Sequence, residues 1–171
     1  MAFSINASGV VAGWFLDANL DYHAFERATN GTITVINAPG AAGTYGYSIN
    51  NSGTITGNSW LGGQGASGIV RSASGTITTF NAPGAGTGDS QGTMGLGINT
   101  SGAVTGYYVD SNSVCHGFIR TASGTLTEFS AAGAGKAANQ GTFPNQINAS
   151  GTVIGYYVDA SNVIHGFLLT E

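Results

Sequence analysis

Charged residues, cysteine and long apolar runs are all scarce in this chain of 171 residues. Only 7 % of the residues are charged, and three arginines and one lysine leave a net charge of −4. The chain lacks the basic surface that binds phosphate backbones, so we expect no nucleic-acid partner. No apolar run approaches the roughly 20 residues of a membrane helix, so we expect no membrane contact either.

The single cysteine, Cys115, excludes a disulfide within the chain and leaves the redox compartment undetermined. The residues from Met1 to Ser4 lead straight into a repeated motif, without the charged and apolar segments of a signal peptide. Strong helix formers are few, whereas 29 glycines stand among many Thr, Ser, Asn, Val, Ile, Tyr and Phe residues. This composition favours short strands joined by tight turns.

The dominant feature of the sequence is a repeat. The phrase Ile-Asn-x-Ser-Gly-x-(Val/Ile)-x-Gly begins at Ile5, Ile49, Ile98 and Ile147, which gives periods of 44, 49 and 49 residues. Each copy divides into strand-like runs separated by turn residues, and in the third copy these runs are 93–99, 103–109, 116–120 and 125–129. The Asn-x-Ser-Gly and Ala-Ser-Gly-Thr segments between them have the chemistry of hairpin turns.

A four-stranded meander repeated at this period is typical of a β-propeller blade. We therefore predict an all-β fold with one domain over 1–171, built from the repeats 1–43, 44–92, 93–141 and 142–171. The last repeat lacks a fourth strand, which brings the expected total to fifteen strands, more than the twelve of a β-trefoil. Two arrangements fit this count: a closed ring of four blades, or half of a larger ring made by two chains. An open edge on the last blade would favour a homo-oligomer.

Because strands alternate in direction, the loops between second and third strands share one face with the long connectors between repeats. An Asp and a His six residues apart flank that loop in three copies, as Asp17 and His23, Asp110 and His116, and Asp159 and His165. The second copy has Leu61 and Ser67 instead. A carboxylate that orients an imidazole and holds loop amides is one interpretation of these pairs. A divalent metal held by His23, His116 and His165 is another, although each loop alone offers only two ligands.

Aromatic residues end the second strand of each copy, just below the loop-bearing face. Core packing is one role for them, and a ring of platforms that bind sugars is the other. Trp60, Tyr107 and Tyr156 are the aromatic candidates for ligand contact. Cys115 does not form a nucleophile and base pair with His116, since neighbouring side chains on a strand point to opposite faces.

Several motifs together resemble the bacterial HAF-type extracellular repeat. They are Tyr-Tyr-Val-Asp-(x)5-His-Gly-Phe, Gly-Thr-(Ile/Leu)-Thr-x-Phe, Ala-Pro-Gly, the Ile-Asn-x-Ser-Gly turn, and the triplet His23-Ala24-Phe25. The resemblance covers essentially the whole chain and implies a propeller-like fold and a secreted or cell-surface parent protein. It implies no particular activity, and the second copy departs from it at Ser67-Gly68-Ile69.

The repetition of one Asp, His and aromatic set favours binding over catalysis, because reaction chemistry needs unlike groups at one place. We expect a binding module that recognises a glycan or another small polar molecule on the loop-bearing face, with no obligatory cofactor. Two alternatives stay open: a hydrolase with Asp and His groups, with or without a metal, near the central axis, and a structural surface or adhesion repeat without a small ligand.

Overall fold

The computed structural model describes residues 1–170, and these residues form strands and turns only. No helix that could cross a membrane occurs among them. The strands are β1 (Ala2–Ile5), β2 (Val11–Leu16), β3 (Tyr22–Arg27), β4 (Ile33–Ile36), β5 (Gly43–Ile49), β6 (Ile55–Trp60), β7 (Ser67–Arg71), β8 (Ile77–Phe80), β9 (Gly92–Ile98), β10 (Val104–Val109), β11 (Cys115–Arg120), β12 (Leu126–Phe129), β13 (Gly141–Ile147), β14 (Val153–Val158) and β15 (Ile164–Leu169).

Successive strands pair antiparallel and form four meanders. The first meander is β1–β4, the second β5–β8, the third β9–β12 and the fourth β13–β15. The predicted all-β class is confirmed, and the four strands expected in the third copy correspond to β9–β12 with each end shifted by at most one residue. The regular Asn/Ser/Gly turns explain this agreement, because they fix the ends of every strand.

The Asn-x-Ser-Gly turn is held by its own asparagine. In the third meander Asn99 Oδ1 accepts hydrogen bonds from the amides of Ser101 and Ala103, at 3.1 and 2.9 Å. Gly102 follows with a φ of 82°, in the left-handed region that favours glycine. The equivalent turns of the other three meanders repeat both amide contacts.

The same asparagines also join one meander to the next. Asn6 Nδ2 donates to the carbonyl of Asn50 at 3.2 Å, Asn50 Nδ2 to the carbonyl of Asn99 at 3.0 Å, and Asn99 Nδ2 to the carbonyl of Asn148 at 3.1 Å. We call this series the asparagine ladder. The same residue of the repeated phrase makes the same contact at each junction, so every meander has the same register against its neighbour.

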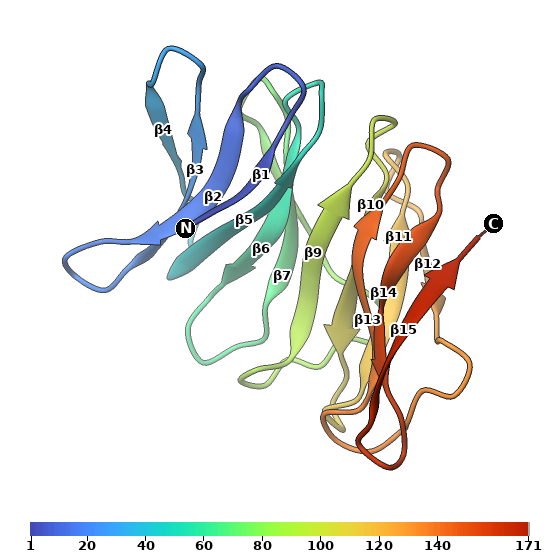
Figure 1. The fold of residues 1–171 in the computed structure, drawn as a ribbon. Coiled ribbons are helices and arrows are strands. Elements are labelled where there is room, and N and C mark those ends of the chain that lie inside the picture. Colours follow the sequence, from blue (N-terminus) through green and yellow to red (C-terminus); the bar gives the residue numbers. More distant parts are fainter. Residues whose placement is uncertain (171) are drawn as a thin grey trace.

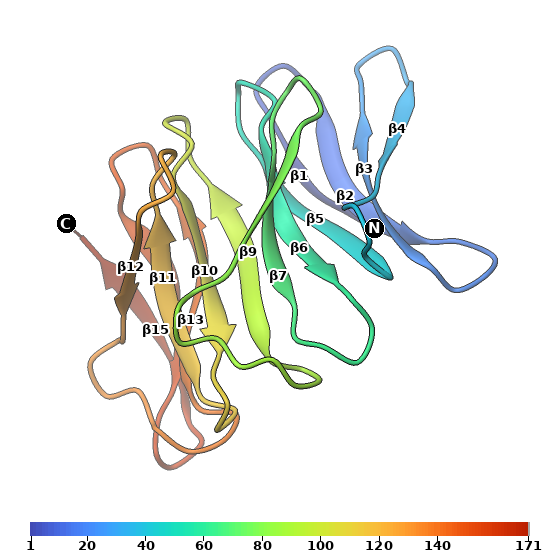
Figure 2. The ribbon, with the colours of Figure 1, turned by 180° about the vertical axis from the view of Figure 1, so that it is seen from behind.

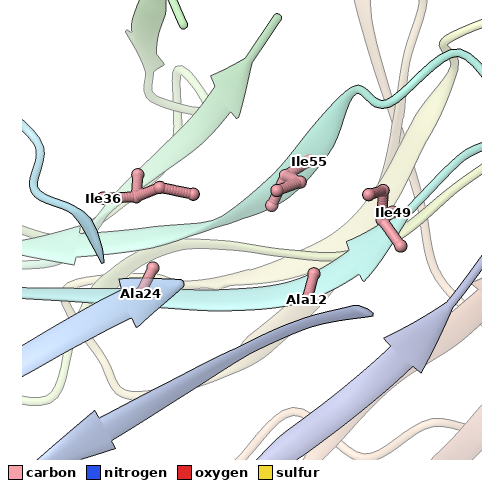
Figure 3. Close-up of a cluster of buried hydrophobic side chains, with 5 residues drawn as sticks. All are labelled: Ala12, Ala24, Ile36, Ile49 and Ile55. Atoms are coloured by element: carbon pink, nitrogen blue, oxygen red, sulfur yellow. The ribbon is translucent and has the colours of Figure 1, made fainter. Parts of the chain in front are cut away.

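The meanders stand side by side in an open row, with the N-terminal meander at one end and the C-terminal meander at the other (Figure 1). The reverse view shows the same order (Figure 2). The apolar core lies between neighbouring meanders. Figure 3 shows one cluster, to which the first meander contributes Ala12, Ala24 and Ile36 and the second contributes Ile49 and Ile55. A second cluster joins the second and third meanders around Phe118, which is fully buried.

A glycine in the second strand of each meander lets the first strand bulge against it. The register between β5 and β6 shifts at Gly46 and Ser48, opposite Gly57. A Cβ at Gly57 would overlap the carbonyl oxygen of Tyr45. The last glycine of the repeated phrase is therefore required by the close approach of two backbones.

The loops between second and third strands bond to the connectors between meanders. The amides of Gly65 and Ala66 donate to the carbonyls of Thr87 and Gln91, both at 2.8 Å. In the next meander the amide of Asn139 donates to the carbonyl of Ser113 at 2.8 Å. All of these irregular segments consequently lie at one end of the strands, opposite the Asn-x-Ser-Gly turns, and form the loop-bearing face.

Candidate functional site

An aspartate and a histidine contact each other on the loop-bearing face of three meanders. The distance from the aspartate Oδ2 to the histidine Nε2 is 3.4 Å for Asp17 and His23, 3.1 Å for Asp110 and His116, and 2.8 Å for Asp159 and His165. Each pair spans the loop between the second and third strands of its own meander. The structure thus brings together the two members of every pair that the sequence singled out.

The other carboxylate oxygen of each pair holds the loop backbone. Asp110 Oδ1 accepts hydrogen bonds from the amides of Asn112 and Val114, at 2.8 and 2.9 Å. Burial opposes ionisation of Asp110, but the Val114 amide, His116 and the Asn112 amide outweigh it and hold the pKa of this carboxyl below its usual value. Because both oxygens already have partners within the protein, the aspartate is suited to fixing its loop.

The histidine rings are held as well. The His116 ring stacks on Tyr108 with a centroid distance of 4.8 Å and an interplanar angle of 16°. His23 Nδ1 lies 2.7 Å from Asn37 Oδ1, and this bond, together with the contact to Asp17, raises the pKa of His23 against the opposing effect of burial. The neighbouring side chains therefore orient these imidazole rings, as expected if the pairs hold the loops in place.

A cavity lies elsewhere, between the second and third meanders. It is a pocket of about 570 Å³ whose aromatic wall is formed by Tyr45, Tyr47, Trp60 and Tyr107. Asn58, Ala66, Met94 and the connector residues 89–91 complete the lining. The second meander, which has no Asp and His pair, therefore contributes one wall of this pocket.

The pocket is there because one repeat position changes its residue. The fourth residue of the second strand is aromatic in the first, third and fourth meanders, as Trp14, Tyr107 and Tyr156, and is Asn58 in the second. A short amide in place of a ring leaves space beside Tyr107 of the next meander. Trp60, two residues further along the second meander, lies at the rim with 38 % of its surface exposed.

Asn58 is the polar group at the wall of this pocket. The residue is only 6 % exposed, and its Oδ1 is buried without a hydrogen-bond partner. An unpaired buried amide oxygen costs about 1–3 kcal/mol. Such a group is an exception that calls for an explanation, and a ligand that pairs with the amide is one.

The tyrosines of the pocket remain neutral at physiological pH. Burial raises the pKa of Tyr47 and of Tyr107 to about 12, reinforced by neighbouring phenols at Tyr47 and by Cys115 and Tyr156 at Tyr107. Their hydroxyl groups can donate as well as accept hydrogen bonds. The pocket therefore combines aromatic faces with an amide and neutral hydroxyls, and has no cation among its lining residues.

Comparison with known proteins identifies the architecture. No family model and no curated protein matches the chain. A solved structure described as that of a streptogramin B lyase is similar, with a TM-score of 0.52 and 14 % sequence identity. The fold is β-propeller-like. The match covers 99 % of this chain and 55 % of the lyase chain, so this chain spans about half the length of that structure. At this identity the similarity concerns the fold alone.

The structure does not bring all of the predicted ligand contacts together at one site. Trp60 and Tyr107 line the pocket. Tyr156 stacks instead on Phe143, with centroids 4.7 Å apart, and Phe143 in turn contacts Tyr107 at 5.2 Å. The three Asp and His pairs stay in separate meanders. Among residues 1–170, no three His, Cys, Asp or Glu side chains gather as a metal-ligand set.

Cys115 is the first residue of β11, directly before His116. The side chain is buried, and burial raises the pKa of its thiol to about 11. A smaller pocket of about 280 Å³ is lined by Asp110, His116 and Lys136 as well as by Cys115. A thiol with that pKa is protonated near neutral pH, so it is a poor nucleophile.

Sequence reasoning missed Asn58, Tyr45 and Tyr47. A usable signal was present, because Asn58 breaks an otherwise aromatic repeat position. Attention to residues shared by the copies led instead to the Asp and His pairs. In a repeat protein, the copy that departs from the others is also a place to look for a site.

Proposed function

We propose that the protein is a binding module of four β-propeller blades that takes a glycan or another small polar molecule in the pocket between its second and third blades. The observation that carries this proposal is Asn58, a buried and unpaired amide beside an aromatic-walled pocket of about 570 Å³. That volume is in the range of small-molecule sites, which are mostly apolar with a few polar groups that fix orientation.

The chemistry of the wall favours a sugar-like ligand. Aromatic faces pack against the C–H faces of a sugar ring, while hydroxyl groups of the ligand can exchange hydrogen bonds with Asn58 and with the neutral phenols of Tyr47 and Tyr107. Asp89 is the one charged residue in the lining, which disfavours anionic ligands.

The Asp and His pairs have a supporting role in this proposal. They hold the loops between second and third strands in the first, third and fourth blades, through bonds to loop amides and to the imidazoles. In the second blade the corresponding loop is tied to the connector by Gly65 and Ala66 instead, directly beside the pocket. The motifs quoted above also support membership of the HAF-type repeat family and an exported parent protein, as further parts of the proposal.

The test is a glycan array followed by calorimetric titration of the hits. The decisive variant is Asn58→Tyr, which places in the second blade the residue that the third and fourth blades carry at this position. We expect it to fill the pocket and abolish binding. Asn19→Tyr is the matched control, since it makes the same change at an exposed loop position on the same face. An array without hits, together with unchanged melting in added sugars, would refute the proposal, as would full binding by Asn58→Tyr.

A further inference from the structure

The two ends of the row expose side chains that are buried at every internal junction. The isoleucine that closes the first strand is 5 % exposed at Ile49, 6 % at Ile98 and 7 % at Ile147, but 68 % exposed at Ile5. Ile5 is in the first meander, which has no meander before it in this chain. Ile33 in β4 of the same meander is also exposed, whereas its counterpart Ile77 packs against the core cluster.

The opposite end shows the complementary pattern. The second residue of the second strand is fully buried at Ala12, Thr56 and Thr105, but Ile154 in the last meander is 49 % exposed. Ile154 pairs with Leu168 of β15, which is exposed as well. The row therefore ends in an apolar face at a position where the internal meanders carry only alanine or threonine.

The asparagine ladder is also interrupted at both ends. Asn148 holds its own turn through Oδ1, but within residues 1–170 its Nδ2 has no acceptor, unlike those of Asn6, Asn50 and Asn99. At the other end, among the described residues 1–170, the carbonyl of Asn6 accepts only from the amide of Gly9, whereas the internal ladder carbonyls accept a second hydrogen bond from an asparagine side chain. One end thus offers a donor and the other an acceptor.

We propose that two copies of this chain join end to end at both junctions and close a single propeller ring with twofold symmetry. The fourth meander of each copy packs on the first meander of the other, and Asn148 Nδ2 donates to the carbonyl of Asn6 of the second copy. Each half of the contact is already present in the chain, and the internal junctions show how the two halves fit.

The internal junction also indicates which side chains meet. Ala12 and Ile49 belong to one buried cluster across the first junction, and Figure 3 shows them on neighbouring strands. Ile154 occupies the position of Ala12, and Ile5 that of Ile49. In the ring, Ile154 of one copy therefore lies against Ile5 of the other. A head-to-tail contact of this kind closes into a ring only if the rotation per subunit permits it, and otherwise forms a filament.

The test is the mass in solution, measured by light scattering and sedimentation at micromolar concentration. We expect about twice the single-chain mass of 17.1 kDa, with no further growth on concentration. Ile5→Lys alone and Ile154→Asp alone should each give monomers with an unchanged circular dichroism spectrum, because both side chains are exposed in the single chain. The double variant, which pairs Lys with Asp at both junctions, should recover the dimer.

Leu61→Asp is the matched control, because Leu61 is an exposed apolar residue of the second meander, away from both ends. It should remain a dimer. A monomeric wild type, a mass that grows without limit, or a dimer that survives both single variants would each overturn the proposal. Ligand binding is measured separately in the pocket, so failure of one proposal is distinguishable from failure of the other.

Discussion

Replacement of Asn58 by tyrosine should make the protein more stable while it removes ligand binding. The side chain of Asn58 leaves a buried amide oxygen unpaired next to a large pocket. Removing that unpaired group recovers about 1–3 kcal/mol. Burying most of an aromatic ring adds about 1.5–3 kcal/mol. Because the pocket is open to solvent at Trp60, we take the lower part of both ranges, about 2.5–4 kcal/mol in total.

The assay is equilibrium urea unfolding and thermal melting of wild type, Asn58→Tyr and Asn19→Tyr at one protein concentration. For a chain of this length each kcal/mol raises the melting temperature by about 2–4 °C. We therefore expect a rise of about 5–15 °C for Asn58→Tyr. The exposed control should change stability by less than about 0.5 kcal/mol. Unchanged or reduced stability of Asn58→Tyr would refute the reasoning, since it would mean that the amide is already paired or that the space cannot hold a ring.

Two further predictions concern the ladder and the histidines. Asn99→Ala removes two hydrogen bonds from turn amides and the hydrogen bond to the Asn148 carbonyl, all at a buried position, so the free energy of unfolding should fall by about 2–4 kcal/mol. Asn99→Asp should keep the turn hydrogen bonds, so its destabilisation should measure the loss of the hydrogen bond to the Asn148 carbonyl together with the burial of a charge. In an NMR titration His23 should have a raised pKa, and Asn37→Ala should lower it. Because the pKa of His23 is higher in the folded than in the unfolded protein, the stabilisation by its contacts is complete below about pH 6.5 and is lost as the pH rises through the folded pKa. A His23 midpoint that is insensitive to Asn37 would contradict the assignment.

The local structure could be predicted from the sequence because each strand end is fixed by its own turn. Asn99 and Gly102 specify the hairpin of the third copy without help from other meanders, and the predicted strands follow. The Asp110 and His116 contact was likewise accessible, since six residues across one loop bring the two side chains together.

The pocket could not be predicted in the same way, and the sequence left open a closed ring of four blades or half of a larger ring, because both features depend on how meanders pack. The space beside Asn58 is bounded by Tyr107 and Met94 of the next meander, and only the relative position of the two meanders makes it a cavity. The second copy contributed only Trp60 to the ligand contacts expected from the sequence, because it lacks the Asp and His pair. The pocket beside Trp60 depends on Asn58, a single departure from an otherwise aromatic repeat position.

The asparagine ladder has a consequence for how such chains can change in length. Every junction uses one amide, one carbonyl and one isoleucine supplied by the repeated phrase itself, so a whole unit can be inserted or deleted without creating a new kind of contact. The stability of such an array is then approximately the sum of the stabilities of its units and of the interfaces between adjacent units. The number of units in a closed particle is then decided by the angle between adjacent units, a property that no individual unit encodes alone.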